Sequence, residues 1–253
     1  MIERDRQILC IKNLFHDVQS ITMPSVAGLV HTTYIVKAAD KKYICRFSKN
    51  TTAQHNLAVS KLLLANNIKV PDVSVYHFED MCCETYPFLD GKTLHERMLE
   101  GFSDKEKNKI YEQLFDLSCK IASIQYDSVK VNSHENIFAK TADKVFSLAN
   151  PHEKKVLAYA DLNTKNVLLD KDDNVCALID LDSVNARNFS FGFISMMSCA
   201  KSAGFIPKDL IKKYIATRPK TRISIQKQIQ IYNFFIRLYI NVIRKHMLNS
   251  RNK

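Results

Sequence analysis

The first ninety residues combine amphipathic and alternating segments that predict a small β-rich region. Apolar residues at helical spacing within residues 1–20 predict an opening helix. β-branched residues dominate 21–36, which predicts two strands joined near Gly28. Residues 41–48 alternate between polar and apolar and predict a third strand. We expect the remaining elements of this region to be a helix over 51–66 and strands over 73–76 and 84–89.

The rest of the chain shows mainly helical spacing. Ser103 and Glu106 form a capping-box pattern before a helix whose apolar positions recur through Gln125. The apolar residues of 189–204 are assigned to packing under the substrate cleft. We predict further helices over 142–149, 207–217 and 223–247. We expect the broad apolar stripe of the last one to dock on the core, with insertion into a membrane surface as the alternative.

Two acidic side chains and an amide stand at fixed intervals between these helices. Asp161 and Asn166 lie five residues apart in a D-L-x-x-x-N pattern, which is the spacing of a kinase catalytic loop. A predicted β-hairpin over 167–179, with a polar turn at 171–174, would return Asp180 beside Asn166. Phosphoryl transfer needs such a set, because one carboxylate receives the proton of the acceptor hydroxyl while an amide and a second carboxylate hold magnesium on the phosphates.

The segment 159–182 resembles the catalytic core of the aminoglycoside phosphotransferase and choline kinase superfamily. It is also similar to the bacterial lipopolysaccharide kinases that phosphorylate Kdo or heptose. The resemblance implies ATP-dependent phosphorylation of a hydroxyl on a small molecule or glycan. In this interpretation Asp161 would be the base, and Asn166 and Asp180 would bind Mg²⁺ with the help of Asp182.

The same resemblance implies an α+β fold of the bilobal, protein-kinase-like type. A β-rich N-terminal lobe would occupy residues 1–86, a hinge 87–92, and a mainly helical lobe 93–253. The family's usual histidine before the catalytic loop is Tyr159 here, at a position that is more often structural than chemical.

The resemblance also assigns nucleotide-binding positions in the first lobe. Gly28, His31 and Thr32 match loosely the loop that covers the nucleotide phosphates, although an ordinary hairpin turn explains Gly28 equally well. Arg46 falls where the family places the cation that pairs with those phosphates. Two positions of the hinge, whose backbone would meet the adenine, are Tyr86 and Phe88.

The helix after this cation should supply a glutamate partner, and this chain departs from that pattern. The matching positions 54–56 read Gln-His-Asn and contain no acid. This leaves open whether Arg46 is oriented by an amide, by Glu84 or by nothing. A pseudokinase that serves as a nucleotide-binding or scaffold module is therefore an alternative to an active enzyme.

Charge is distributed unevenly along the chain. Residues 201–253 contain thirteen Lys or Arg and one acid, a net charge of +12, whereas the whole chain has a net charge of +11. This asymmetry favours an anionic partner such as a phosphorylated substrate or a membrane surface. A solvated basic face without a partner is the alternative, and the missing aromatic-basic motif argues against nucleic acid. The basic region also favours the second enzyme hypothesis, a Kdo-type kinase of the lipopolysaccharide core acting at the membrane surface.

The seven cysteines and the N-terminus suggest an intracellular protein. The cysteines show no C-x-x-C pair, and we expect them to be reduced, mostly core residues. No signal peptide and no stretch of 18 apolar residues is present. We therefore expect a cytoplasmic location, with peripheral binding to the inner membrane face if the basic region meets lipid.

Overall fold

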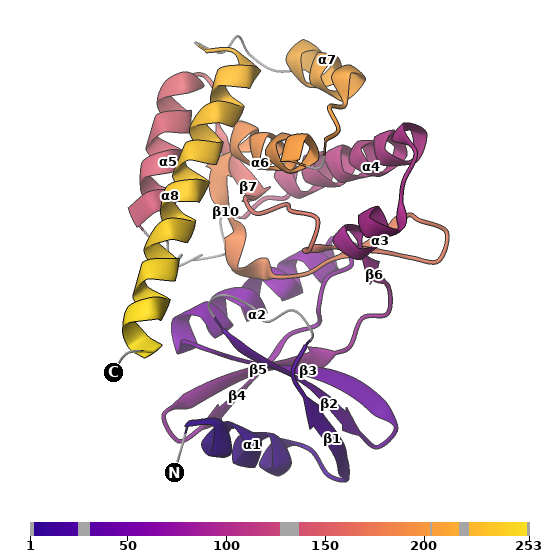
Figure 1. Cartoon of the computed structure of the whole chain (residues 1–253), viewed down its shortest axis with the longest axis vertical. Coiled ribbons are helices and arrows are strands. Elements are labelled where there is room, and N and C mark those ends of the chain that lie inside the picture. The colour runs from indigo at the N-terminus through magenta and orange to yellow at the C-terminus, as the bar shows by residue number, and fades with distance from the viewer. Residues whose placement is uncertain (1–2, 25–30, 127–136, 203, 218–222, 252–253) are drawn as a thin grey trace. The chain divides into compact units, whose positions relative to one another are not determined.

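A computed structural model describes residues 3–24, 31–126, 137–202, 204–217 and 223–251, and the chain divides into two units (Figure 1). The sheet unit contains the described residues of Met1–Gly91 together with Cys176–Asp182. The helical unit contains the described residues of Lys92–Asp127, Glu135–Val175 and Ser183–Lys253.

The sheet unit is built on a five-stranded antiparallel sheet in the order β1-β2-β3-β5-β4. Its helices α1 and α2 lie on opposite sides of the sheet (Figure 1). The elements are α1 (Glu3–Leu14), β1 (Val18–Thr22), β2 (Thr32–Ala38), β3 (Lys41–Ser48), α2 (Asn50–Ala65), β4 (Ser74–Phe78) and β5 (Met81–Pro87).

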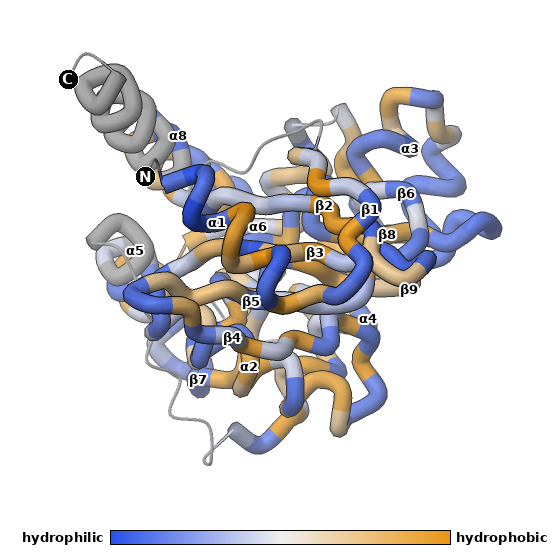
Figure 2. The backbone as a smooth tube through the Cα atoms, turned by 90° about the horizontal axis from the view of Figure 1, so that it is seen from below, coloured by the Kyte–Doolittle hydropathy of each residue, from blue (hydrophilic) through white to orange (hydrophobic). Residues whose placement is uncertain are grey.

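Strand alternation gives the sheet two different faces. Cys45 and Phe47 of β3 pack with Cys10 and Ile11 of α1 in a buried apolar cluster, and β2 carries a hydrophobic stretch into it (Figure 2). Arg46, between them in the sequence, must point to the other face, because successive side chains of a strand alternate. That second face is the one that α2 covers.

The helical unit contains a two-stranded sheet and six helices among its described residues. β7 (Lys155–Tyr159) pairs antiparallel with β10 (Val184–Asn188), and β6 (Lys92–Thr93) pairs with β8 (Val167–Leu169) in a short sheet of order β6-β8-β9. β9 (Val175–Leu178) starts in the helical unit at Val175, and its later residues belong to the sheet unit. The helices are α3 (Leu94–Glu100), α4 (Asp104–Ala122), α5 (Ile137–Ala149), α6 (Phe189–Ser202), α7 (Lys208–Thr217) and α8 (Ile225–Arg251).

Helix α6 forms the centre of the helical unit. It is buried along almost its whole length and contacts α4, α5, α8, β7 and β10. Phe193 stacks on Tyr214 of α7 with ring centroids 3.8 Å apart, and Phe191 meets Tyr232 of α8 edge-on at 5.6 Å. The packing of the apolar residues of 189–204 is therefore confirmed for these residues. In the predicted stripe of α8, Ile229 and Tyr232 are buried, whereas Leu238 is 39% exposed.

The predicted elements agree with the structure except at some boundaries. The capping box of Ser103 and Glu106 is present at α4, with both reciprocal hydrogen bonds. The opening helix is shorter than expected, because Asp17 takes a left-handed φ of 53° and Val18 begins β1. The sequence reasoning did not predict α3, β7 or β10 as separate elements. No helix among the described residues has the length and hydropathy needed to span a bilayer.

Candidate active site

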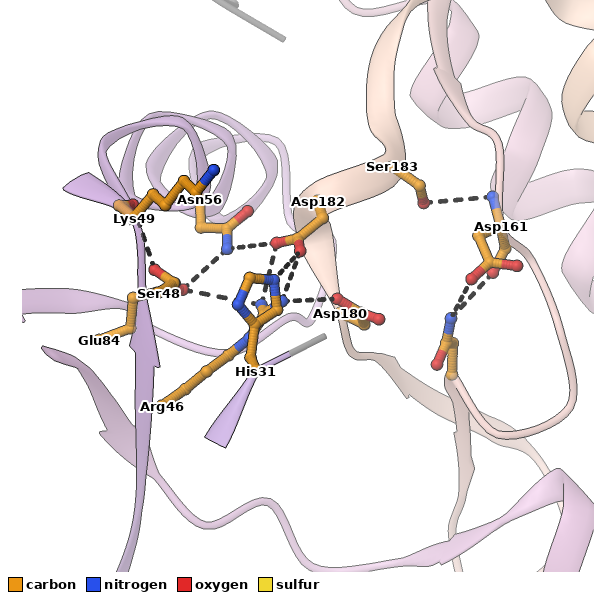
Figure 3. Close-up of polar contacts among 11 residues, drawn as sticks. His31, Arg46, Ser48, Lys49, Asn56, Glu84, Asp161, Asp180, Asp182 and Ser183 are labelled. Carbon is orange, nitrogen blue, oxygen red and sulfur yellow. Dashed lines mark hydrogen bonds and ion pairs between the residues drawn. The ribbon is translucent and has the colours of Figure 1, made fainter. Parts of the chain in front are cut away.

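The segment between β7 and β8 forms a tight loop in the helical unit that carries Asp161 and Asn166. The Asn166 side-chain amide donates from Nδ2 to the Asp161 carbonyl oxygen at 3.0 Å and to its carboxylate Oδ2 at 3.3 Å (Figure 3). The Asn163 N–H donates to the Asp161 carbonyl at 2.8 Å, and the Asn166 N–H donates to the Asn163 carbonyl at 3.1 Å. These bonds fix the direction of the half-buried Asp161 side chain.

Neighbouring elements of the same unit hold this loop at both ends. The Asp161 N–H donates a hydrogen bond to the Ser183 hydroxyl at 3.2 Å, and the Ala160 N–H donates to the Ser183 carbonyl at 3.0 Å. The Tyr232 hydroxyl of α8 lies 3.3 Å from the Ala160 carbonyl. The His95 N–H of α3 donates to the Thr164 carbonyl at 2.9 Å. Contacts from three directions make the loop a rigid support for a reacting group.

The predicted hairpin after the loop is confirmed. β8 and β9 are joined by a turn in which the Asp170 N–H donates to the Asn174 carbonyl at 3.0 Å. The Asp170 carboxylate accepts the Asp172 and Asn174 N–H groups at 2.9 Å each. Asp180 follows β9 with φ of 66°, a left-handed conformation that is uncommon outside glycine and that often marks functional positions.

Arg46 lies in the central strand of the five-stranded sheet and is 9% exposed, so it is not an edge-strand cation. Its guanidinium forms a two-pronged pair with Asp182, with Nη1 2.9 Å from Oδ1 and Nη2 bonded to Oδ2 (Figure 3). Asp180 lies 3.4 Å and Glu84 3.9 Å from the same guanidinium. One buried cation therefore faces three carboxylates.

Asp182 is the most heavily bonded of these carboxylates. Both of its oxygens are bonded to Arg46. In addition, Oδ1 accepts a hydrogen bond from Asn56 Nδ2 at 2.6 Å, and Oδ2 lies 3.1 Å from His31 Nε2. Asp180 has a side chain that is 45% exposed. The two carboxylates thus differ, because Asp182 is enclosed by donors while Asp180 is accessible.

The electrostatics of this cluster favour the charged forms. Burial lowers the pKa of Arg46, but the negative charges of Asp180, Asp182 and Glu84 outweigh burial and raise that pKa above its ordinary value. Burial raises the pKa of the Asp182 carboxyl, and the donors His31, Arg46 and Asn56 together outweigh burial, so this pKa lies below its usual range. Arg46 and Asp182 are therefore a stable ion pair at neutral pH.

The remaining predicted nucleotide-binding positions are spread over the sheet unit. Tyr86 pairs with Ile44 in the β3–β5 ladder, so its side chain lies on the face that carries Arg46 and Glu84. The Phe88 N–H donates to the Lys42 carbonyl at 2.9 Å and extends the sheet by one bond. Thr32 starts β2, opposite Phe47. Gly28 lies outside the described residues.

Sequence reasoning missed one member of the Arg46 cluster and left another undecided. Ser48, which donates to Glu84 Oε1 at 2.5 Å, was not considered, and Asn56 was covered only by the open choice of an amide. Glu84 was named as one of three open choices. The signal for Glu84 lies in the strand register rather than in the sequence, because Arg46 and Glu84 are directly opposite in the β3–β5 ladder and share a face.

Comparison with protein-family models and with curated proteins finds no match for the sequence. Comparison with solved structures finds aminoglycoside phosphotransferases. A thermostable mutant of APH(4)-Ia, in ternary complex with ADP and hygromycin B, is 12% identical over 96% of this chain and 93% of its own, with a TM-score of 0.67. The gentamicin complex of APH(2")-IIa is 15% identical, covers 92% and 87%, and has a TM-score of 0.63. The GDP complex of aminoglycoside 2'-phosphotransferase-IIIa is 12% identical, covers 93% and 87%, and has a TM-score of 0.62.

The chain therefore has the bilobal, kinase-like α+β fold of the aminoglycoside phosphotransferases, as the sequence predicted. The coverage extends over nearly the whole length of both partners in each comparison, so the likeness includes both units. At 12–15% identity this likeness concerns the fold.

Proposed function

We propose that the chain is a nucleotide-dependent phosphotransferase that transfers a γ-phosphate to a hydroxyl of a small molecule. The observation that carries the proposal is the Asp161–Asn166 loop, in which a half-buried carboxylate is held by an amide at kinase-loop spacing. The solved structures of similar fold support it, since they include a complex with ADP and hygromycin B, a complex with gentamicin and a complex with GDP. Asp161 would accept the proton of the attacking hydroxyl, because a carboxylate in hydrogen-bond reach of that proton can act as general base.

The residues of this chain fit a magnesium ion at two of the three predicted positions. Mg²⁺ prefers oxygen ligands. The Asn166 side chain donates a hydrogen bond to Asp161 from Nδ2, so the side-chain oxygen of Asn166 lies on the other side of its amide group. Asp180 offers an accessible carboxylate, whereas both oxygens of Asp182 receive donors. Among the described residues no three His, Cys, Asp or Glu side chains are grouped to hold a metal by themselves. This fits Mg²⁺, which usually binds through one or two carboxylates and substrate phosphates.

A bound Mg²⁺ would neutralise charge that develops on the phosphates. We assign its binding to Asn166 and Asp180, and we assign Asp182 to the orientation of Arg46. Arg46 would contact the nucleotide phosphates with His31 beside it, and Gly28 and Thr32 would belong to the segment that covers them. Tyr86 and Phe88 would lie near the adenine or guanine base.

The test below also distinguishes two alternative functions. A kinase of lipopolysaccharide-core sugars would use the same loop on a lipid-linked acceptor, and the basic region 201–253 motivates it. A pseudokinase would bind nucleotide and transfer nothing, which the missing acid at 54–56 motivates. The first alternative predicts a labelled product that extracts with lipid, and the second predicts nucleotide binding without any labelled product.

The test is a screen with γ-labelled ATP and GTP against aminoglycosides, choline, free sugars and lipid A precursors. The proposal expects Mg²⁺-dependent label on at least one water-soluble acceptor, and it expects this label to disappear in Asp161→Asn. Asp116→Asn, an exposed acid of α4 in the same unit, is the matched control and should keep the activity. Label that is unchanged in Asp161→Asn would refute the assigned base.

A further inference from the structure

Arg46 is a buried cation, and the helix that follows it lacks the expected acid. The matching positions 54–56 of α2 are Gln, His and Asn. In the sheet, however, Arg46 stands directly opposite Glu84 of β5, and Glu84 Oε2 lies 3.9 Å from Arg46 Nη1. The Glu84 side chain is 1% exposed. A carboxylate this deeply buried is costly unless it is paired and hydrogen-bonded, so its placement beside Arg46 needs a physical reason.

Hydrogen bonds hold the Glu84 carboxylate on both of its oxygens. Ser48 Oγ donates to Oε1 at 2.5 Å, and Asn56 Nδ2 donates to Oε2 at 2.8 Å. Ser48 lies on the same strand as Arg46, two residues further, and therefore on the same face. The carboxylate is thus fixed by its own sheet and by one residue of α2 (Figure 3).

Asn56 makes a second bond that explains why an amide stands at this position. Its Nδ2 also donates to Asp182 Oδ1 at 2.6 Å, so one amide nitrogen bridges two carboxylates. An acid at position 56 would turn a donor into a further negative charge against Glu84 and Asp182. Like charges at this distance in a buried site repel strongly. The glutamate on the strand and the amide on the helix therefore depend on each other.

We propose that Glu84 and Asn56 together replace the helix glutamate as the positioning residues for Arg46, with the acid moved from α2 to β5. This inference rests on the proposed function, in which Arg46 meets the nucleotide phosphates. The Arg46–Glu84 pair is set by the register of two neighbouring strands, whereas the hydrogen bond from Asn56 to Glu84 depends on the position of α2.

The test compares the affinities of ADP and of adenosine for the full-length protein, by calorimetric titration. Glu84→Gln keeps the shape of the side chain and removes its charge. We expect it to weaken ADP binding about 10- to 100-fold, since the loss of one interaction between charged groups weakens binding by about this much. Adenosine has no phosphate and should bind Glu84→Gln as it binds the wild type. Glu79→Gln is the matched control, because Glu79 is an exposed acid of the β4–β5 turn that pairs with Arg6.

The double variant tests the mutual dependence. Asn56→Asp alone should weaken ADP binding, because it sets a third carboxylate against Glu84 and Asp182. In that background Glu84→Gln should strengthen ADP binding, since it restores the number of charges and provides an amide donor to the carboxylate introduced on α2. If Glu84→Gln weakens ADP binding in the wild type and strengthens it in Asn56→Asp, the two residues are directly coupled. Both variants are isosteric with the natural residues, and thermal unfolding verifies that they fold.

Several results would overturn the inference. ADP affinity of Glu84→Gln equal to that of Glu79→Gln would show that Glu84 does not position Arg46. An equal loss of ADP and adenosine affinity would assign Glu84 to the fold alone. Additive effects of the two changes would disprove the coupling. A wild-type protein that binds none of ADP, ATP or GDP would refute the proposed function itself, and this inference with it.

Discussion

The hydroxyl of Tyr232 connects α8 to the segment that carries Asp161, and the removal of this one oxygen atom tests the connection. This hydroxyl lies 2.8 Å from Ser195 Oγ of α6 and 3.3 Å from the Ala160 carbonyl, and the residue is 6% exposed. Burial raises the pKa of Tyr232, so the hydroxyl stays protonated at neutral pH and donates its hydrogen to one of the two oxygens. Tyr232→Phe removes this hydroxyl and keeps the ring, which still meets Phe191 edge-on.

The expected effect follows from the buried hydrogen bonds that are lost. One net hydrogen bond contributes about 0.5–1.5 kcal/mol, and a buried partner left without a bond costs about 1–3 kcal/mol. We expect Tyr232→Phe to lower the free energy of unfolding by about 1–2 kcal/mol. For a unit of this size each kcal/mol corresponds to a decrease of about 2–4 °C in Tm.

Urea unfolding at equilibrium, analysed by linear extrapolation, measures this difference. The matched control is Phe234→Leu on the same helix, because Phe234 is 62% exposed and its replacement should change the free energy of unfolding by less than about 0.5 kcal/mol. If Tyr232→Phe unfolds at the same urea concentration as the wild type, the docking of α8 through this hydroxyl is refuted.

Three further predictions concern the metal, the packing behind the loop and the thiols. ATP affinity of the wild type should depend strongly on Mg²⁺ and that of Asp180→Asn weakly, with Asp172→Asn of the exposed hairpin turn as control. Calorimetric titration with Mg²⁺ or chelator measures this, and equal wild-type affinities in both would exclude Asp180 as a ligand. Gly192→Ala should destabilise the protein by about 1–3 kcal/mol, because its new Cβ would lie 3.0 Å from the buried Tyr159 carbonyl oxygen. Thermal unfolding measures it, and a rise in Tm, from the better helix propensity of Ala, would contradict it. Burial raises the pKa of Cys82 to about 11, so about one thiol in a thousand is ionised at pH 8 and iodoacetamide should label this residue slowly in the native protein. Mass spectrometry before and after denaturation checks this, and rapid native labelling of Cys82 would oppose it.

The fold could be predicted because its signals are local. The alternation of β3, the capping box of α4 and the polar turn of the β8–β9 hairpin each depend on a few adjacent residues, and the structure contains all three. β7 was missed because its residues 156–159 form one apolar run without alternation, and β10 was missed because three of its five residues are polar and nevertheless buried. Their pairing joins residues far apart in the sequence.

Only part of the candidate site could be predicted from the sequence. Spacing alone brought out Asp161 and Asn166, because both stand in one short loop. The donors around Asp182 come from β3, from α2 and from the residue before β2, and no spacing rule links residues so distant in sequence. The sequence therefore indicated that an acid was missing at 54–56, but it could not show that Glu84 and Asn56 share its place.

The central claim of this account is that Asp161 accepts the proton of the acceptor hydroxyl. Its most direct test is the rate of γ-phosphate transfer to the acceptor found by the screen, measured for the wild type and for Asp161→Asn together with their nucleotide affinities. The account predicts that the variant transfers phosphate about 10²–10⁴-fold more slowly and binds nucleotide with nearly unchanged affinity. Equal transfer rates in the two proteins would contradict it.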